Sequence, residues 1–577
     1  MKKKAISGIA AAAAILWLLT APRPSAKEAL PVPPSSVTEA EGCTVIMVGK
    51  EASSDGSTMA THTADCGSCD WTWRHVPAAN HKPSEKRKIY HISQYKTWPP
   101  SEGLKWDLYK KSFGGLEIPE VPHTYAYHHG MFGYINENQV AIGESTIGTR
   151  RKMVNSTPSA GLDLTMLTLL AMERSRTARE AIRIMGSLAE KYGYGFHDDG
   201  EMLAVHDPNE IWVFEIMPVG ALWVPQSGKP GAVWCAQRVP DDHVCVCPNE
   251  SRIGEIDLND PDYFMASSNA VTYAVENGYY DPKAGKPFNW KRAYSPAEGS
   301  AVSSKGRRAR MWRFFDIVAP SRNFSPETPN MDFPFSVKPD GKLSLQDVMA
   351  LTRDKCEGTD FDPVKGIRGG PFKNPNYYKG TRLISVANVE YTTLTQCRGW
   401  LPAPVGGIVW LSFGPQDTSC YMPFYAGATD MPKSFSVGDH FVFNRESARW
   451  AFDYVDFHVQ AAYSLAINDV KEAQARHESD VVSRIPEIDG QAQALYAKKP
   501  ADAAKFLTGF CLNNAQNVVD AWWKLGDSLL VKYNHLAFYN SEKRAVERGK
   551  TAPPPWWQKA VEAYDILMEP ESKKRGE

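Results

Sequence analysis

Residues 43–65 read CTVIMVGKEASSDGSTMATHTAD, and this stretch decides how the folded part of the chain begins. The runs Cys43–Val48 and Thr58–Ala64 contain many β-branched residues and flank a Ser-Ser-Asp-Gly turn signal, so they predict a β-hairpin. Pairing the two runs across the turn places Cys43 opposite Asp65. We therefore expect the hairpin to bring a thiol and a carboxylate together.

Strands and amphipathic helices alternate after this hairpin. Two helix starts carry capping boxes, Thr177 with Glu180 and Ser344 with Asp347. Further strands are predicted at Met131–Ile135, Gln139–Gly143 and Ile211–Met217. This alternation favours layered helices and sheets over an all-β sandwich.

The last part of the chain has a different pattern. Two strand-like runs, Thr381–Thr393 and Gly406–Phe413, precede a stretch, 446–485, without proline or glycine. Aromatic and aliphatic residues keep a helical period within that stretch. We expect residues 441–577 to form a helical extension.

The N-terminus has the pattern of an export signal. Three lysines precede the apolar run Ile6–Leu19, and small residues follow it. The pattern predicts a signal peptide over 1–26, a linker or propeptide over 27–42, and export to the periplasm or the extracellular space; an uncleaved anchor is the alternative. No later stretch matches the roughly 20 apolar residues of a membrane span, so we expect no stable membrane insertion after processing.

The size and charge balance of the chain limit the kinds of partner it can bind. With 577 residues, the chain can bury a large core and add a second structural unit. Its 65 Lys and Arg residues balance 66 Asp and Glu residues, so no basic surface for nucleic acid is expected. A homo-oligomer is left open.

Ten cysteines include two close pairs, Cys66 with Cys69 and Cys245 with Cys247. Disulfides or buried thiols are the favoured interpretation. A four-sulfur zinc site is the alternative, although the second pair is closer than the usual spacing. We expect no metal and no cofactor.

Several separated blocks share a resemblance to one family. The residues from Gly42 to Met59 resemble the start of the mature enzymes of the dipeptidase A and secernin family of N-terminal-nucleophile cysteine hydrolases. Further blocks resemble that family in the right order: His62–Asp65, Asn136–Glu144, Trp234–Asp241, Asn249–Ile253 and Ala350–Asp354. The resemblance covers roughly residues 43–430.

This resemblance implies a fold and an activity. It implies an α+β fold, a four-layer αββα sandwich over residues 43–440, with the helical extension following it. It also implies an exported dipeptidase that hydrolyses short peptides after proteolytic maturation.

The chemistry expected of Cys43 follows from its position. An N-terminal cysteine carries its own general base, because a free α-amine has a pKa of roughly 7.7 to 8.0. An acylated nitrogen has no basic lone pair, so the preceding segment must be removed first. A lipoprotein cysteine is disfavoured, since Cys43 stands 24 residues after Leu19. An ordinary buried strand cysteine is the remaining alternative.

The resemblance implies roles for five more residues. Asp65 matches an aspartate near the nucleophile's amine, and Asn249 matches an oxyanion-binding asparagine. Arg252 could bind a substrate carboxylate and Glu144 a substrate amine. His62 stands where penicillin- and bile-salt-hydrolysing relatives have arginine. Structural or surface roles are the alternative for each.

Other hydrolase classes fit less well. The Cys-Gly-x-Cys-Trp pattern of papain-like proteases is not found near Cys43, and no Gly-x-Ser-x-Gly elbow occurs. An acylase that cleaves penicillin-type or bile-salt amides is the nearest alternative function. A catalytically inactive exported binding protein on the same fold is the other.

Overall fold

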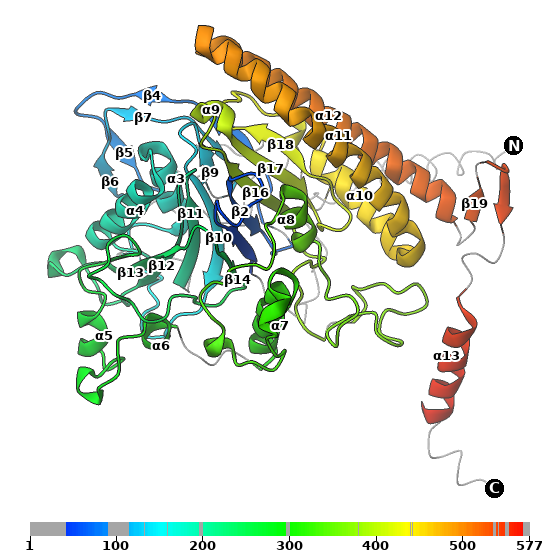
Figure 1. Cartoon of the computed structure of the whole chain (residues 1–577), viewed down its shortest axis with the longest axis horizontal. Helices are drawn as coiled ribbons and strands as arrows, with labels where there is room; N and C mark the ends of the chain where they lie inside the picture. The colour runs from blue at the N-terminus through cyan, green and yellow to red at the C-terminus, as the bar shows by residue number, and fades with distance from the viewer. Residues whose placement is uncertain are drawn as a thin grey trace, which may run out of the picture. The chain divides into compact units, whose positions relative to one another are not determined.

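The computed structural model describes residues 42–568 with gaps, and these residues belong to one compact unit (Figure 1). The gaps are residues 68, 91–114, 132, 158–159, 196–199, 296–300, 379, 439, 441, 535–537, 541 and 548–552. The predicted signal peptide, 1–26, and the linker residues 27–41 lie outside the described residues.

The first large sheet has six antiparallel strands and contains the predicted hairpin. Its strands, in spatial order, are β14 (Val244–Cys247), β1 (Val45–Val48), β2 (Thr58–Thr63), β16 (Tyr391–Cys397), β17 (Gly407–Phe413) and β18 (Met422–Tyr425). The hairpin of β1 and β2 lies inside the sheet, because β14 pairs with β1 on one side and β16 with β2 on the other.

The second large sheet has eight antiparallel strands. Its strands, in spatial order, are β15 (Phe264–Ala266), β13 (Ala232–Val239), β12 (Ile211–Pro218), β11 (Gly200–His206), β10 (Ala141–Ile147), β9 (Gly133–Asn136), β8 (Tyr127–His129) and β3 (Arg74–Val76). Three predicted strands are confirmed here as β9, β10 and β12. Small two-stranded sheets pair β4 (Ala79–Asn80) with β7 (His123–Thr124), β5 (Lys86–Lys88) with β6 (Glu117–Pro119), and β19 (Phe538–Asn540) with β20 (Ala545–Glu547).

Burial on both faces explains why β1 is apolar throughout. Val45 and Met47 belong to a core shared with the eight-stranded sheet, whereas Ile46 and Val48 belong to a second core. Successive side chains of a strand point to opposite faces, so each face of β1 packs against a different layer. The shared core places the two sheets face to face.

The two sheets approach each other closely beside Gly143 on β10. A Cβ added at this glycine would lie 2.8 Å from the carbonyl oxygen of Thr61 on β2. Only a residue without a side chain allows this separation. Gly143 therefore lets the next residue, Glu144, reach the edge of the hairpin.

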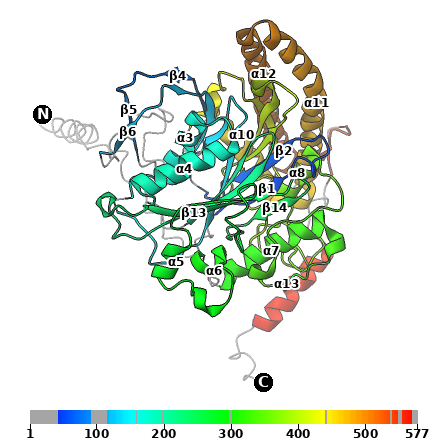
Figure 2. The same ribbon diagram turned by 60° about the vertical axis from the view of Figure 1, so that its left-hand side comes forward.

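Helices contact both sheets, and their starts follow the capping residues. α3 (Leu164–Arg174) and α4 (Ala178–Tyr192) contact the eight-stranded sheet, and α7 (Ala301–Val318) contacts β14 (Figure 2). The capping box of Ser344 is confirmed at the start of α8 (Leu345–Thr352). The side chain of Thr177 caps α4. The side chain of Glu180, however, accepts a hydrogen bond from the backbone N–H of Arg176 rather than from that of Thr177, so this predicted capping box does not form. Shorter helices are α5 (Thr272–Glu276), α6 (Trp290–Tyr294) and α9 (Ala403–Gly406).

Long helices form most of the described C-terminal part. These are α10 (Ala448–Ala461), α11 (Tyr463–Lys498) and α12 (Pro500–Tyr533), followed by α13 (Pro555–Met568). α11 and α12 lie side by side as a long pair (Figures 1 and 2). Two partly buried ion pairs join α11 to the rest of the unit: Arg353, at the end of α8, binds Glu478 at 2.5 Å, and Arg398, directly after β16, binds Asp489. A mixed fold with a helical C-terminal part is therefore present, as expected.

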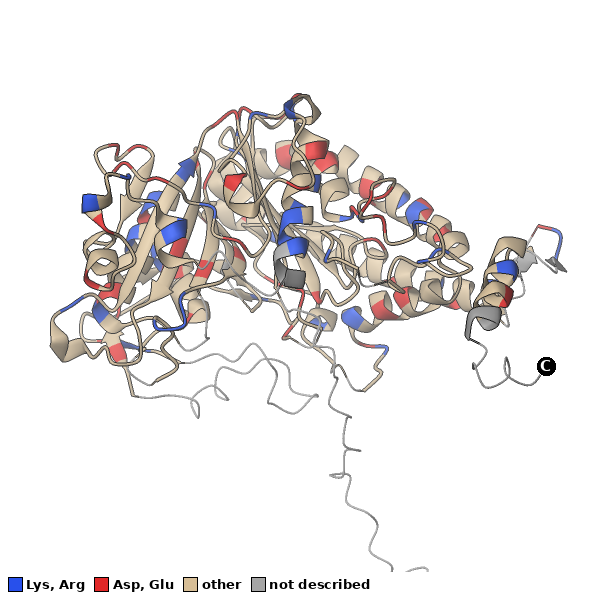
Figure 3. Cartoon of the chain, turned by 90° about the horizontal axis from the view of Figure 1, so that it is seen from below, with Lys and Arg blue, Asp and Glu red and all other residues tan. Residues whose placement is uncertain are grey.

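Among the described residues, no helix is both long and apolar enough to cross a membrane. Both signs of charge are interspersed over the elements drawn in Figure 3. This mixture agrees with the formal net charge of −1.

Two further sequence predictions need correction. The run Thr381–Thr393 is not one strand: only its last three residues belong to β16. The preceding residues form a loop instead, in which the side chains of Arg382 and Asn388 bond to Asp65. The predicted register is also one residue off, since Asp65 pairs with Gly42.

Next to the bridge between Gly42 and Asp65, the two strands of the hairpin are joined by hydrogen bonds to threonine hydroxyl groups. Thr61 and Thr63 of β2 accept hydrogen bonds through their side chains from the backbone N–H groups of Ile46 and Thr44, each at 2.9 Å. The regular β1–β2 ladder stops at this point, and side chains replace it. The end of the hairpin that carries the thiol is therefore held slightly apart from β2.

Candidate active site

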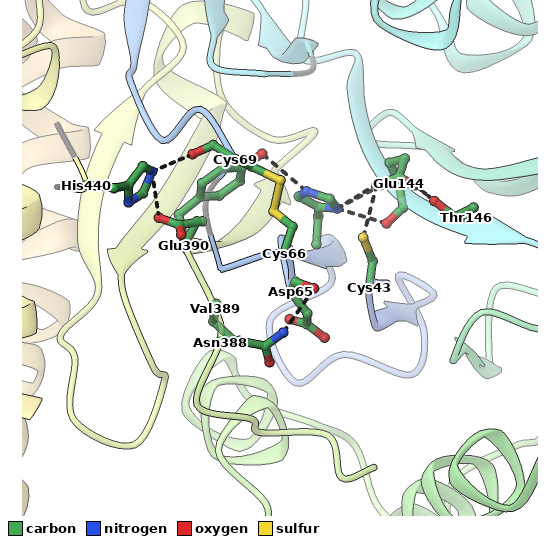
Figure 4. Close-up of a disulfide and its surroundings, with 12 residues drawn as sticks. Cys43, Asp65, Cys66, Cys69, Glu144, Thr146, Asn388, Val389, Glu390 and His440 are labelled. Carbon is green, nitrogen blue, oxygen red and sulfur yellow. Dashed lines mark hydrogen bonds and ion pairs between the residues drawn. A yellow bond between two sulfur atoms is a disulfide. The ribbon is translucent and has the colours of Figure 1, made fainter. Parts of the chain in front are cut away.

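Cys43 lies just before β1, and three distant parts of the chain hold it. Its side chain is buried, with 8% exposed. Its thiol donates to Oε2 of Glu144 on β10 at 3.2 Å, and Figure 4 shows the two side chains directed toward one another. Its carbonyl oxygen accepts a hydrogen bond from Arg310 on α7 at 2.9 Å. Both sheets and a helix thus converge on one cysteine.

His62 of β2 lies against the same carboxylate. Its Nδ1 is 2.8 Å from the carbonyl oxygen of Glu144 and 3.7 Å from Oε2 of that residue. The imidazole ring packs near Tyr134 and Tyr391, with ring centroids 6.3 and 5.7 Å away. The structure therefore brings two predicted substrate-binding residues, His62 and Glu144, to the thiol of Cys43.

Asn249 faces the backbone nitrogen of the same cysteine. It adopts a left-handed conformation, with φ of 60°, which asparagine tolerates better than most residues. Its Oδ1 accepts hydrogen bonds from the N–H of Cys43 at 3.3 Å and from Arg310 at 3.1 Å. Its Nδ2 donates to Thr146 and Ser145. The amide oxygen thus faces the cysteine here, and the oxyanion role of Asn249 stays a prediction.

Asp65 is buried beside the residue that precedes the cysteine. Its backbone exchanges hydrogen bonds with Gly42, at 3.3 and 3.1 Å. Its Oδ2 accepts from Arg382 at 2.6 Å, while its buried Oδ1 has no hydrogen-bond partner among the described residues. Asp65 therefore lies next to the start of the predicted mature chain, and its role near the amine of Cys43 stays a prediction.

Gly42 fits a space that no larger residue could enter. A Cβ added there would lie 2.5 Å from both Nη1 of Arg382 and Oδ1 of Asn249. These distances are shorter than any van der Waals contact, so a side chain would displace two residues of the cluster. Glycine at position 42 allows the cluster to form around the Gly42–Cys43 peptide.

Arg252, the predicted carboxylate-binding residue, belongs to a neighbouring buried cluster. Its guanidinium donates to the carbonyl oxygen of Pro334 and contacts Met311. Its backbone N–H donates to Oε1 of Glu215 at 2.6 Å. Glu215 also accepts from Ser251 and from Trp290. This carboxylate thereby fixes the turn that presents Asn249, and the substrate role of Arg252 stays a prediction.

The electrostatics of the site keep the resting thiol protonated. Burial raises the pKa of the Cys43 thiol well above its ordinary value, and the carboxylates of Glu144 and Asp65 raise it further. Arg382 acts in the opposite direction. A thiol in this state is a poor nucleophile until a base removes its proton.

Two arginines of the site were not found from the sequence. Arg310 belongs to a basic run that looks like a solvated helix face, yet its side chain is 1% exposed. Arg382 belongs to the run wrongly predicted as a strand. No motif marks either residue, because their contacts join segments that are far apart in the chain.

The structure also shows the state of the two close cysteine pairs found in the sequence. Cys66 and Cys69 form a disulfide directly after Asp65 (Figure 4). Cys245 and Cys247 on β14 are buried free thiols. The favoured interpretation, disulfide or buried thiol, is confirmed for both pairs, and the four-sulfur zinc site is wrong because two of its ligands are bonded to each other.

A buried cysteine at the start of a central strand, held between two antiparallel sheets, defines a site for thiol chemistry. A family model described as peptidase family C69 matches residues 42–476. The chain belongs to this family. The match begins one residue before Cys43 and extends into α11.

Curated relatives agree with this family. A probable dipeptidase of Latilactobacillus sakei is 26% identical over 414 residues, which cover 69% of this chain and 76% of the relative. A probable dipeptidase of Salmonella dublin is 26% identical over 396 residues, which cover 67% and 81%. Dipeptidase A of Lactobacillus helveticus is 25% identical over 414 residues, which cover 70% and 79%. The resemblance to the dipeptidase A family is confirmed.

Proposed function

We propose that the chain is an exported cysteine-type dipeptidase whose nucleophile is the thiol of Cys43, freed as the N-terminal residue by proteolysis. The observation that carries this proposal is the convergence of Glu144, Asn249 and Arg310 on one buried cysteine. The family match that begins at residue 42 and the names of the relatives support it.

Removal of the segment before Cys43 changes the chemistry of its nitrogen. In the intact chain this nitrogen is an amide that donates to Asn249. After cleavage it becomes an amine, which can take the thiol proton directly or through one water. The thiolate then attacks the peptide carbonyl, and the ammonium returns its proton to the leaving amine. Water hydrolyses the resulting thioester and regenerates the thiol.

The position of Gly42 indicates where the substrate acyl group binds. In the intact chain, the carbonyl of Gly42 is the acyl group attached to the nitrogen of Cys43. The backbone of Asp65 bonds to both the N–H and the carbonyl oxygen of Gly42. Once this residue leaves, a dipeptide can place its N-terminal residue in the same space. The buried carboxylates of Glu144 and Asp65 are the groups that would attract the ammonium of that residue.

The finer fold and the location are parts of the same proposal. A four-layer αββα order is supported by α3 and α4 on the eight-stranded sheet and by α10 and α12 on β17 and β18. Export is supported by the lysine-led apolar run at 6–19 and by the Cys66–Cys69 disulfide, which fits an oxidising compartment. Fractionation of cells that express the full chain, with a cytoplasmic marker, tests export.

Intact mass and N-terminal sequencing of active protein test maturation. We expect a chain that begins at Cys43, and an active chain that begins near residue 27 would overturn the proposal. The C43A variant should fold and lose turnover. Retained dipeptide hydrolysis by C43A would reject Cys43 as the nucleophile.

Substrate class is tested with a panel of dipeptides beside penicillin V and a conjugated bile salt. We expect the dipeptides to be hydrolysed with the highest kcat/KM. A preference for either of the other two amides would replace dipeptidase with acylase while leaving the nucleophile unchanged.

A further inference from the structure

Besides their proposed part in catalysis, three side chains of the site could act together as metal ligands: those of Cys43, His62 and Glu144. Each offers one ligand atom, and the three atoms lie within 4.8 Å of one another. Among the described residues, this is the one group of three such side chains gathered so closely. All three side chains are buried. The three residues come from β2, from β10 and from the segment just before β1, so no spacing in the sequence indicates the group.

The distances match those of a tetrahedral zinc ion. Zinc binds sulfur at about 2.3 Å and nitrogen or oxygen at about 2.0 to 2.2 Å, so its ligands lie roughly 3.3 to 3.8 Å from one another. The Sγ of Cys43 is 3.2 Å from Oε2 of Glu144, and Nδ1 of His62 is 3.7 Å from the same oxygen. Two of the three edges of the ligand triangle are therefore already close to the required length.

The chemistry of the donors and their surroundings also fits. Thiolate, imidazole and carboxylate are the three ligand types that zinc accepts in proteins, and three protein ligands leave one position open. The second carboxylate oxygen of Glu144 accepts from Thr146 at 3.1 Å, which orients the group. Zinc binding would require Nδ1 of His62 to exchange its contact with the Glu144 carbonyl oxygen for the metal.

We propose that Cys43, His62 and Glu144 form a reversible Zn²⁺ site whose occupancy blocks the thiol. On binding, the S–H bond of Cys43 is replaced by a bond from sulfur to zinc, and the proton passes to solvent without any redox change. Binding needs only three side chains, so it does not depend on maturation. Its inhibitory effect rests on the proposed role of Cys43 as the nucleophile.

Metal binding itself is the decisive measurement. Chelator-treated protein is titrated with Zn²⁺ in equilibrium dialysis, and with Co²⁺ while the thiolate-to-cobalt charge-transfer band is recorded. We expect one Zn²⁺ per chain and loss of both signals in C43S. The H62N and E144Q variants should each bind Zn²⁺ at least about tenfold more weakly, since each lacks one ligand.

The variants H243N and E255Q are matched controls, because they make the same chemical changes outside the group. Wild-type protein alkylated at Cys43, with the site verified by peptide mapping, covers the case of a misfolded variant. Zinc affinity that is unchanged by C43S and by alkylation, or an absence of bound zinc, overturns the proposal. Zinc binding without loss of dipeptide hydrolysis would retain the site and reject the nucleophile.

Discussion

The thiol of Cys43 and the carboxylate of Glu144 share a hydrogen bond of 3.2 Å in a buried space between two sheets. The two residues are 101 positions apart in the chain, and the glycine before Glu144 allows their strands to meet. This contact stabilises the protonated thiol at rest. It also places a negative charge beside the predicted acyl site.

Removal of that charge should activate the thiol. Glu144 raises the pKa of Cys43, so the E144Q variant should lower this pKa and increase the thiolate fraction at neutral pH. Each unit of pKa change corresponds to about tenfold in thiolate. The rate of iodoacetamide modification of Cys43, followed by peptide mapping across pH, measures the shift. E144D keeps the charge and serves as control; an E144Q profile that overlays the wild type would contradict the role of Glu144.

The same pKa shift predicts a dependence of stability on pH. An exposed thiol has a pKa of about 8.5, and the pKa of Cys43 is higher in the folded chain. The stability contributed by this shift is complete below about pH 8.5 and is lost as the pH rises through the folded-state pKa. Above about pH 8.5, the unfolding free energy of the wild-type protein should therefore fall more steeply with pH than that of C43S. Urea titrations at several pH values measure the difference, and parallel curves for the two proteins would refute it.

The space around Gly42 predicts a block in maturation. In G42A the new methyl group would meet Arg382 and Asn249 at 2.5 Å. The Gly42–Cys43 peptide can then no longer lie in the observed position, so the fraction of chains that begin at Cys43 should fall several-fold. Intact mass spectrometry gives this fraction. The control is G341A, because a Cβ at Gly341 meets nothing within 4 Å; equal processing of both variants would show that the clash is irrelevant.

Glu215 should act as a positioning residue for Asn249. It is fully buried, and its carboxylate accepts hydrogen bonds from Ser251, Arg252 and Ile253, the residues that follow Asn249 in the same turn. In E215Q one acceptor becomes a donor that faces other donors, at a cost of about 1 to 3 kcal/mol. We expect lower kcat with little change in KM, and a lower midpoint in urea. A loss of stability with unchanged kcat in the remaining folded enzyme would limit Glu215 to a structural role.

Local features of this chain could be predicted from sequence, and distant contacts could not. The hairpin and the Ser344 capping box follow from residue types a few positions apart, and both are present. The contact between Arg310 and Cys43 spans 267 positions, and no local pattern encodes it. The same reason explains the error at Thr381–Thr393. Its residues have strand-like character, but Arg382 bonds to a carboxylate 317 positions away.

The turn explains why the register was missed by one residue. The observed pairs Met47 with Ala60 and Gly42 with Asp65 are both centred between residues 53 and 54, whereas pairing Cys43 with Asp65 assumes a turn centred on residue 54. Residue types in a loop predict that a turn forms, but they do not fix its centre to within one residue. Asp65 was nevertheless placed within one residue of its observed partner, which was enough to find the site.

Two neighbouring residues, Arg353 and Asp354, connect α11 and α7 to the site around Cys43. Arg353 binds Glu478 on α11, and the next residue, Asp354, binds Arg313 on α7 through bonds of 2.8 to 3.0 Å. Arg313 lies one helical turn after Arg310, which bonds to the carbonyl oxygen of the cysteine. Asp354 therefore holds the helix whose Arg310 bonds to Cys43.

The D354N variant should loosen α7 and thereby reduce turnover. Loss of a partly buried, bidentate charge pair should cost about 1 to 3 kcal/mol of stability. We expect kcat to fall about tenfold, which corresponds to about 1.4 kcal/mol in the barrier, because Arg310 no longer holds the reacting cysteine in place. D316N is the matched control, since Asp316 binds the same Arg313 at 3.2 Å from a more exposed position and leaves the bidentate pair intact. If D354N and D316N lower kcat equally, the connection through α7 does not exist; if only D354N does, and the pH profile of Cys43 alkylation shifts with it, the helix positions the thiol.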